Sequence, residues 1–114
     1  MQFGLFGKLI EDARENKDFV LVTVVEADGS TPARAGFRMA VYADGSSHGT
    51  VGGGNLEHTA HRLALEQLRT GGPSFLRAFS MAADLNMACG GDVRLFFEPY
   101  TPWQIGRASC RERV

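Results

Sequence analysis

Three consecutive glycines stand at the junction between a predicted strand and a predicted helix, in the stretch GTVGGGNLE of residues 49–57. Glycine takes positive φ values and carries no side chain that would keep a ligand away from the backbone. Asn55 is a good helix N-cap, and the backbone amides at such a junction form a natural site for an anion such as phosphate. The other interpretation, a tight turn that needs glycine only for its geometry, stays open. The residues concerned are Gly52, Gly53, Gly54 and Asn55.

A second candidate is Cys89, which Gly90 and Gly91 follow in a loop of small residues. Backbone amides of glycines can stabilise a thiolate, and a soft thiolate suits a soft metal or a sulfur transfer. Cys89 is therefore a candidate ligand for a metal. The competing interpretation is that Cys89 is a small buried apolar residue, as lone cysteines commonly are.

Charged and imidazole side chains add two further candidates. Arg34 and Arg38 follow the loop that begins at Asp28-Gly29-Ser30-Thr31-Pro32, which is either a binding loop or a solvated connection. The Asp44-Gly45 pair predicts a hairpin that brings both arginines near the three glycines. His58 and His61 lie three residues apart and could share a metal, but without a further ligand we favour exposed polar positions on a helix.

The apolar pattern predicts the elements that position these residues. An amphipathic helix is expected over residues 3–15, and a second helix begins at Asn55 and ends at Gly71-Gly72-Pro73. The segment of residues 19–25 is apolar on both faces, which predicts a central strand covered on both sides. Further strands are expected over 37–42, 47–51, 75–81 and 93–98. The predicted fold is α/β: one domain with a mixed sheet of about five strands and two main helices packed on it.

Length and composition restrict the classes of function that the chain could have. The chain has 114 residues with a formal net charge of -1, which fits one domain and shows no basic patch for nucleic acid. It has no apolar run of the ~20 residues that span a membrane and no secretory signal, so we expect a cytoplasmic protein. Residues 105–114 lack apolar periodicity and resemble a translated sequencing adaptor. We therefore expect residues 1–104 to form the domain and the last ten to be a non-native tail.

Three segments in order carry a resemblance to a known family. They are Gly29 to Pro32 with residues 36–39, the glycine stretch of residues 49–57, and Met87-Ala88-Cys89-Gly90-Gly91 ahead of a strand that ends in Phe97-Glu98-Pro99. Together they resemble the N-terminal domain of the XdhC family, the xanthine dehydrogenase accessory proteins, which includes the CoxI type. The resemblance covers residues 3–100. Many members carry arginine where this chain has Ala33. Many also continue into a second, Rossmann-like domain, and a short single-domain form exists in the family; the adaptor-like tail favours a truncated chain.

The resemblance implies a chaperone rather than an enzyme. Family members are thought to bind the molybdenum cofactor (molybdopterin) as cargo, to support its sulfuration by a cysteine desulfurase, and to deliver it to a xanthine dehydrogenase-type molybdenum hydroxylase. The glycine amides would then take the phosphate or the pterin edge, Arg34 and Arg38 would add charge-assisted bonds, and Cys89 would stand near the molybdenum or the exchangeable sulfur. Two alternatives stay open: a cysteine-based sulfurtransferase or redox enzyme, and a docking module without its own ligand. The sequence leaves the oligomeric state open, a homo-oligomer included.

Overall fold

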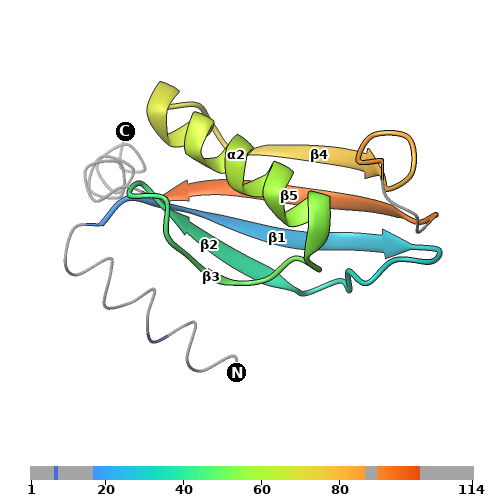
Figure 1. The fold of residues 1–114 in the computed structure, drawn as a ribbon. Coiled ribbons are helices and arrows are strands. Elements are labelled where there is room, and N and C mark those ends of the chain that lie inside the picture. Colours follow the sequence, from blue (N-terminus) through green and yellow to red (C-terminus); the bar gives the residue numbers. More distant parts are fainter. Residues whose placement is uncertain (1–6, 8–16, 87–89, 101–114) are drawn as a thin grey trace, which may run out of the picture.

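A five-stranded sheet carries one long helix across one of its faces (Figure 1). The computed structural model describes residues 7, 17–86 and 90–100. In chain order the elements are β1 (Phe19–Asp28), β2 (Arg38–Tyr42), β3 (Ser47–Gly49), α2 (Gly54–Thr70), β4 (Phe75–Ser80) and β5 (Asp92–Tyr100). The described residues form a single compact domain.

All strand pairs of the sheet are antiparallel, in the order β3-β2-β1-β5-β4. The predicted mixed sheet is therefore wrong. The reason is that α2 leads from β3 at one edge to β4 at the other edge, so the crossover joins strands that are not neighbours. Parallel pairing would have required the helix to return the chain to an adjacent strand.

Two predictions about the strands are confirmed. β1 lies at the centre of the sheet, as its apolar sequence indicates. β2 and β3 form a hairpin, in which Gly45 has a φ of 92° and its N–H donates to the carbonyl of Tyr42 at 2.9 Å. The carboxylate of Asp44 accepts hydrogen bonds from Ser46 and so closes the turn.

The described residues contain one long helix, so the prediction of two main helices is not supported. The first predicted helix, over residues 3–15, lies outside the described residues except for Gly7. α2 begins after Gly53, and Asn55 is not its N-cap, because the Asn55 side chain donates to Leu85 instead. The predicted C-terminus is confirmed: Gly71 has a φ of 72°, and the N–H groups of Gly71 and Gly72 donate to the carbonyl of Gln67.

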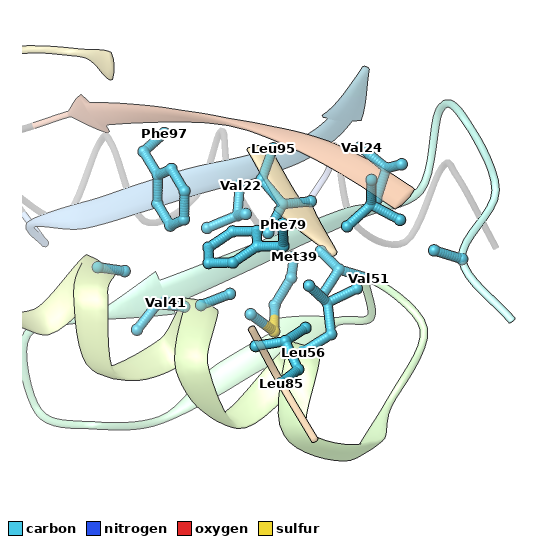
Figure 2. Close-up of a cluster of buried hydrophobic side chains, with 14 of the residues drawn as sticks. Val22, Val24, Met39, Val41, Val51, Leu56, Phe79, Leu85, Leu95 and Phe97 are labelled. Atoms are coloured by element: carbon cyan, nitrogen blue, oxygen red, sulfur yellow. The ribbon is translucent and has the colours of Figure 1, made fainter. Parts of the chain in front are cut away.

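The main core lies between α2 and one face of the sheet (Figure 2). Alternation along each strand sends every second side chain to this face. The core contains Val20, Val22, Val24, Met39, Val41, Leu56, Ala60, Leu95 and Phe97. These contacts hold the start of α2 against the sheet, where the candidate site lies.

The opposite face of the sheet is covered only in part. Phe19, Ala40 and Tyr42 form a small buried cluster at one end of it. Further along β1, on this same face of the sheet, the side chain of Val25 is 47% exposed. The prediction that β1 is covered on both faces therefore holds at its first residues and fails toward its end. No helix in the described part of the chain is long and apolar enough to cross a membrane.

Candidate functional site: three loops at one end of the sheet

Three loops meet at the end of the sheet where β1 ends, β5 begins and α2 starts (Figure 1). We call them the first loop (residues 29–37), the glycine turn (residues 50–53) and the third loop (residues 81–86 and 90–91, the part that the structure describes). Each follows or precedes a strand whose register the sheet fixes, so strand pairing brings together segments far apart in the sequence. The three loops contain most of the site residues that the sequence predicts.

The first and third loops pack backbone against backbone. A Cβ built on Gly91 would lie 2.7 Å from the carbonyl oxygen of Asp28 and 2.9 Å from Cβ of Thr31. A Cβ on Gly29 would lie 3.2 Å from Cα of Gly91. Glycine at position 91 is therefore a requirement of this close approach, independent of any ligand.

The glycine turn packs on the first loop in the same way. A Cβ on Gly52 would lie 3.1 Å from both N and Cα of Ala33, a residue that is itself fully buried. The φ values of Gly52, Gly53 and Gly54 are 128°, 82° and 60°, which other residues rarely adopt. Backbone geometry alone thus accounts for all three glycines, and their role in ligand binding stays a prediction.

Glu57 fills the donor-rich side of the glycine turn. Its Oε1 accepts hydrogen bonds from the hydroxyl of Thr50 and from the N–H groups of Val51 at 3.3 Å and Gly53 at 3.2 Å. The Thr50 hydroxyl in turn accepts from Gly52 N–H at 3.0 Å. The Glu57 carboxylate and the Thr50 hydroxyl therefore occupy the amides of Gly53 and Gly52, two of the four residues that the sequence assigns to an external anion.

This arrangement changes where an anion could bind. A phosphate at the amides of Gly52 and Gly53 would have to displace Glu57, or be repelled by it at short range. Helix α2 has no side-chain cap, so the N–H groups of Gly54, Asn55 and Leu56 at its start point along the helix axis without a capping side chain. These groups, at the positive end of the helix dipole, are the better donors for an anionic ligand.

Asn55 connects the start of α2 to the third loop. Its Nδ2 donates to the carbonyl of Leu85 at 2.8 Å, across thirty positions of sequence. Leu85 is buried, and Asn86, which follows it, has a φ of 52°. Asn55 therefore ties the start of α2 to the described part of the third loop at Leu85, a role the sequence did not reveal, because nothing local in it pairs these residues.

The structure separates the two predicted arginines. Arg34 lies exposed in the first loop, and its Nη1 donates to the carbonyls of Thr31 at 2.8 Å and Ala33 at 3.1 Å. Arg38 contributes backbone to the site, because its carbonyl accepts from Thr50 N–H at 3.0 Å. Its side chain, however, starts on the sheet face away from α2, since the neighbouring Met39 points into the core.

Cys89, the predicted sulfur or molybdenum contact, lies outside the described residues. The residues that the structure does describe contain no group of three or more histidine, cysteine, aspartate or glutamate side chains that could hold a metal ion. The exposed His58 and its neighbour His61 do not act as a pair, because His61 Nε2 lies 2.8 Å from the carbonyl oxygen of Gly45 and ties α2 to the β2–β3 turn. A hollow of about 260 Å³ beside Lys17 and His48 lies at the opposite end of the sheet and does not extend the site.

The fold and the site define a class: a domain with a helix-covered antiparallel sheet whose glycine-rich loops converge at one end. The XdhC and CoxI family matches residues 12–79, which is more than half of the chain. The chain belongs to the XdhC and CoxI family, as its three motifs indicate.

Two known proteins that are longer than this chain are similar to it. The chain is 32% identical over 96 residues to the uncharacterized protein YqeB of Escherichia coli (strain K12). The aligned region is 82% of this chain and 18% of YqeB. A crystal structure described as a xanthine dehydrogenase from Bacillus halodurans has the same fold, with a TM-score of 0.67 at 22% identity over 81% of this chain and 29% of that one. The chain spans less than a third of either relative.

Proposed function

We propose that this chain is the N-terminal, cofactor-binding part of a xanthine dehydrogenase accessory protein. It would bind the molybdenum cofactor as cargo, receive a cysteine desulfurase that supplies the sulfur, and hand the cofactor to a molybdenum hydroxylase. Membership of the XdhC and CoxI family supports an accessory role of this kind. The protein itself would bind and release, without catalysing a reaction.

The convergence of the three loops is the observation that carries the proposal. Gly52 against Ala33 and Asn55 bonded to Leu85 join segments that are not paired in the sheet, and they lie beside Gly91, which directly precedes the Asp28–Asp92 pair of β1 and β5. Loops held together by a rigid sheet are where ligand sites most often lie. The packing therefore favours a binding surface over a plain connection.

The groups at this surface suit the phosphate of the molybdenum cofactor. The phosphate would lie at the α2 N-terminus, on the amides of Gly54 and Asn55, with the Arg34 guanidinium turning from its own loop to reach it. Glu57 would hold the glycine turn in shape during binding and release. Cys89 would supply the thiolate for the molybdenum or for the exchangeable sulfur.

The test is anaerobic binding of purified molybdenum cofactor to the full chain and to two variants, Arg34→Gln and Cys89→Ala. Loss of charge-assisted hydrogen bonds costs about 1.5–3 kcal/mol, so the dissociation constant should rise roughly tenfold or more in Arg34→Gln. Arg69→Gln is the matched control, because Arg69 lies exposed in the last turn of α2 and pairs only with Glu66 among the described residues.

The second readout is the activation of a cofactor-free molybdenum hydroxylase by the loaded chain. Cys89→Ala should bind the cofactor more weakly and deliver less of the sulfurated form. Equal affinity and delivery in all three variants, each shown to be folded, would reject the cofactor site. Retained docking to the hydroxylase in that case would support the interaction-module interpretation.

A further inference from the structure

Among the described strands, β4 lies at one edge of the sheet and pairs with β5 alone (Figure 1). It has six residues, contains no proline and keeps one register against β5. The strand at the opposite edge, β3, has three residues and ends at Gly49, whose φ is 89°. Short strands, prolines and bulges are the usual protection of sheet edges, so β4 is the longer and less protected of the two.

The backbone groups of β4 alternate between β5 and the open edge. The N–H of Met81 donates to the carbonyl of Gly91 at 2.9 Å, in continuation of the β4–β5 register. Hydrogen-bonded pairs recur at every second residue of an antiparallel ladder, so the odd-numbered residues of β4 bond to β5. The N–H and C=O groups of Leu76, Ala78 and Ser80 therefore point toward the open edge.

Asp84 closes one end of this edge. Its Oδ2 accepts from the N–H of Ser80 at 2.6 Å, and its own N–H donates to the carbonyl of Ser80 at 2.8 Å. The outward groups of Leu76 and Ala78 have no such partner among the described residues. The side chains of Leu76, Arg77 and Ala78 are all exposed. These three residues form what we call the open edge.

Arg77, at the middle of the open edge, gives it a preference for negative charge. Its side chain lies on the α2 side of the sheet, with the guanidinium 5.3 Å from the centre of the Phe75 ring. A hollow of about 300 Å³ extends from Arg77 toward α2, so a side chain beside the edge has room there. Glu66 also lines this hollow and is paired with Arg69. A carboxylate of a partner can therefore meet the Arg77 guanidinium.

The same charge disfavours a second copy of this chain as the occupant. Residues directly opposite each other in an antiparallel ladder lie on the same face of the sheet. The two-fold pairing in which Leu76 of each copy bonds to Ala78 of the other is centred on Arg77. It would place the two arginines directly opposite each other, and like charges in that position are destabilising.

We propose that the open edge binds an extended acidic segment of another protein as a further antiparallel strand. The segment places a glutamate or aspartate opposite Arg77 and apolar residues opposite Leu76 and Ala78. Its backbone bonds to the outward N–H and C=O groups of these two residues, and its apolar side chains lie beside Leu76, which is 50% exposed. Binding of this segment does not depend on the molybdenum cofactor.

Two short peptides test the charge preference. One is acetylated and amidated Ser-Thr-Val-Glu-Val-Thr-Ser, and the other has lysine in place of glutamate. Added to the isotope-labelled full chain, the glutamate peptide should shift the amide resonances of Leu76 and Ala78 and slow the hydrogen exchange of both groups. The dissociation constant of the lysine peptide should be roughly fivefold higher, which is the effect of one cross-strand charge pair.

Two variants and a control separate charge from backbone pairing. Arg77→Glu should reverse the preference between the peptides. Arg62→Glu makes the same change of charge at an exposed position of α2 and should leave the preference as it is in the wild type. Ala78→Pro removes an outward N–H that pairing with β5 does not use, so the chain should fold and lose the binding of both peptides.

Three outcomes would overturn the proposal. Unchanged amide resonances of Leu76 and Ala78 at millimolar concentrations of both peptides would show that the edge binds no such strand. Equal affinity for the two peptides, or an unchanged preference in Arg77→Glu, would reject an acidic partner. A wild-type dimer in sedimentation that Ala78→Pro dissociates would assign the edge to a second copy. If Ala78→Pro fails to fold by circular dichroism, the reversal in Arg77→Glu decides the question.

Discussion

Replacing Gly91 by alanine tests the packing of the first loop against the third loop. The new methyl group would lie 2.7 Å from the carbonyl oxygen of Asp28, 2.9 Å from Cβ of Thr31 and 3.0 Å from the carbonyl oxygen of Ser30. Favourable carbon contacts lie at about 3.5–4.0 Å, so at least one backbone segment must move by roughly half an ångström or more. Two of the three obstacles are backbone atoms, which cannot rotate away as a flexible side chain does.

The expected loss of stability follows from overpacking of this kind, which costs about 1–3 kcal/mol. Urea unfolding followed by circular dichroism measures it. With a slope of about 1–3 kcal/mol per molar urea, a loss of about 2 kcal/mol lowers the midpoint by roughly 1 M. Cofactor affinity should fall as well, because the displaced first loop carries Arg34.

Gly90→Ala is the control that isolates the contact. Both substitutions replace glycine by alanine at neighbouring positions, so they change the unfolded chain alike. Neither residue has a φ in the left-handed region, so neither substitution adds backbone strain from φ. A Cβ on Gly90 meets no described atom within 4 Å, and its substitution should change stability by about 0.5 kcal/mol or less. Equal urea midpoints for the two variants would refute the convergence of the loops.

Three further variants test other contacts. Glu57→Ala removes the acceptor of three donors and should cost about 1–2 kcal/mol in urea unfolding, whereas Glu57→Gln keeps an acceptor oxygen and should cost less; equal losses would contradict the capping role. Asn55→Ala should lower the free energy of unfolding by about 1 kcal/mol and speed amide hydrogen exchange around Leu85. The control His58→Ala, at an exposed position, should change neither quantity. Unchanged exchange in Asn55→Ala would argue against the bond to Leu85. Burial, with the Glu98 carboxylate, raises the pKa of Tyr100 above its ordinary value of about 10, so the native state holds this proton longer than the unfolded chain. The contribution of this proton to folding stability is complete below pH about 10 and is lost as the pH rises through the raised pKa. The urea midpoint should therefore fall less steeply at alkaline pH in Tyr100→Phe than in the wild type. Parallel curves of midpoint against pH would contradict this.

Local patterns predicted most of the elements correctly. The β-branched run of residues 19–25, the Asp44-Gly45 turn and the double glycine after α2 each act through neighbours in sequence, and each is confirmed. The sheet type was wrong, because strand direction depends on which strands become neighbours. No local pattern records that α2 carries the chain from one edge of the sheet to the other.

The site shows the same division. Glycine motifs in the sequence indicated the right segments, because positive φ values and close backbone approach restrict residue type wherever they occur. The partners of those glycines were not visible: the Glu57 carboxylate accepts hydrogen bonds from the N–H groups of Val51 and Gly53, a contact that no local pattern indicates. Asn55 was expected to cap the helix, and its side chain reaches Leu85.

The sequence by itself determined the positions of the strands and of α2, the glycine-dependent turns and the family. These depend on side-chain size, backbone freedom and spacing along the chain. Only the tertiary structure decided which loops are in contact, on which face of the sheet the Arg38 side chain starts, and which backbone N–H groups already have a hydrogen-bond acceptor. The physical reason is that sheet register and helix packing set distances between residues more than sixty positions apart, such as Gly29 and Gly91, and no single segment contains that information.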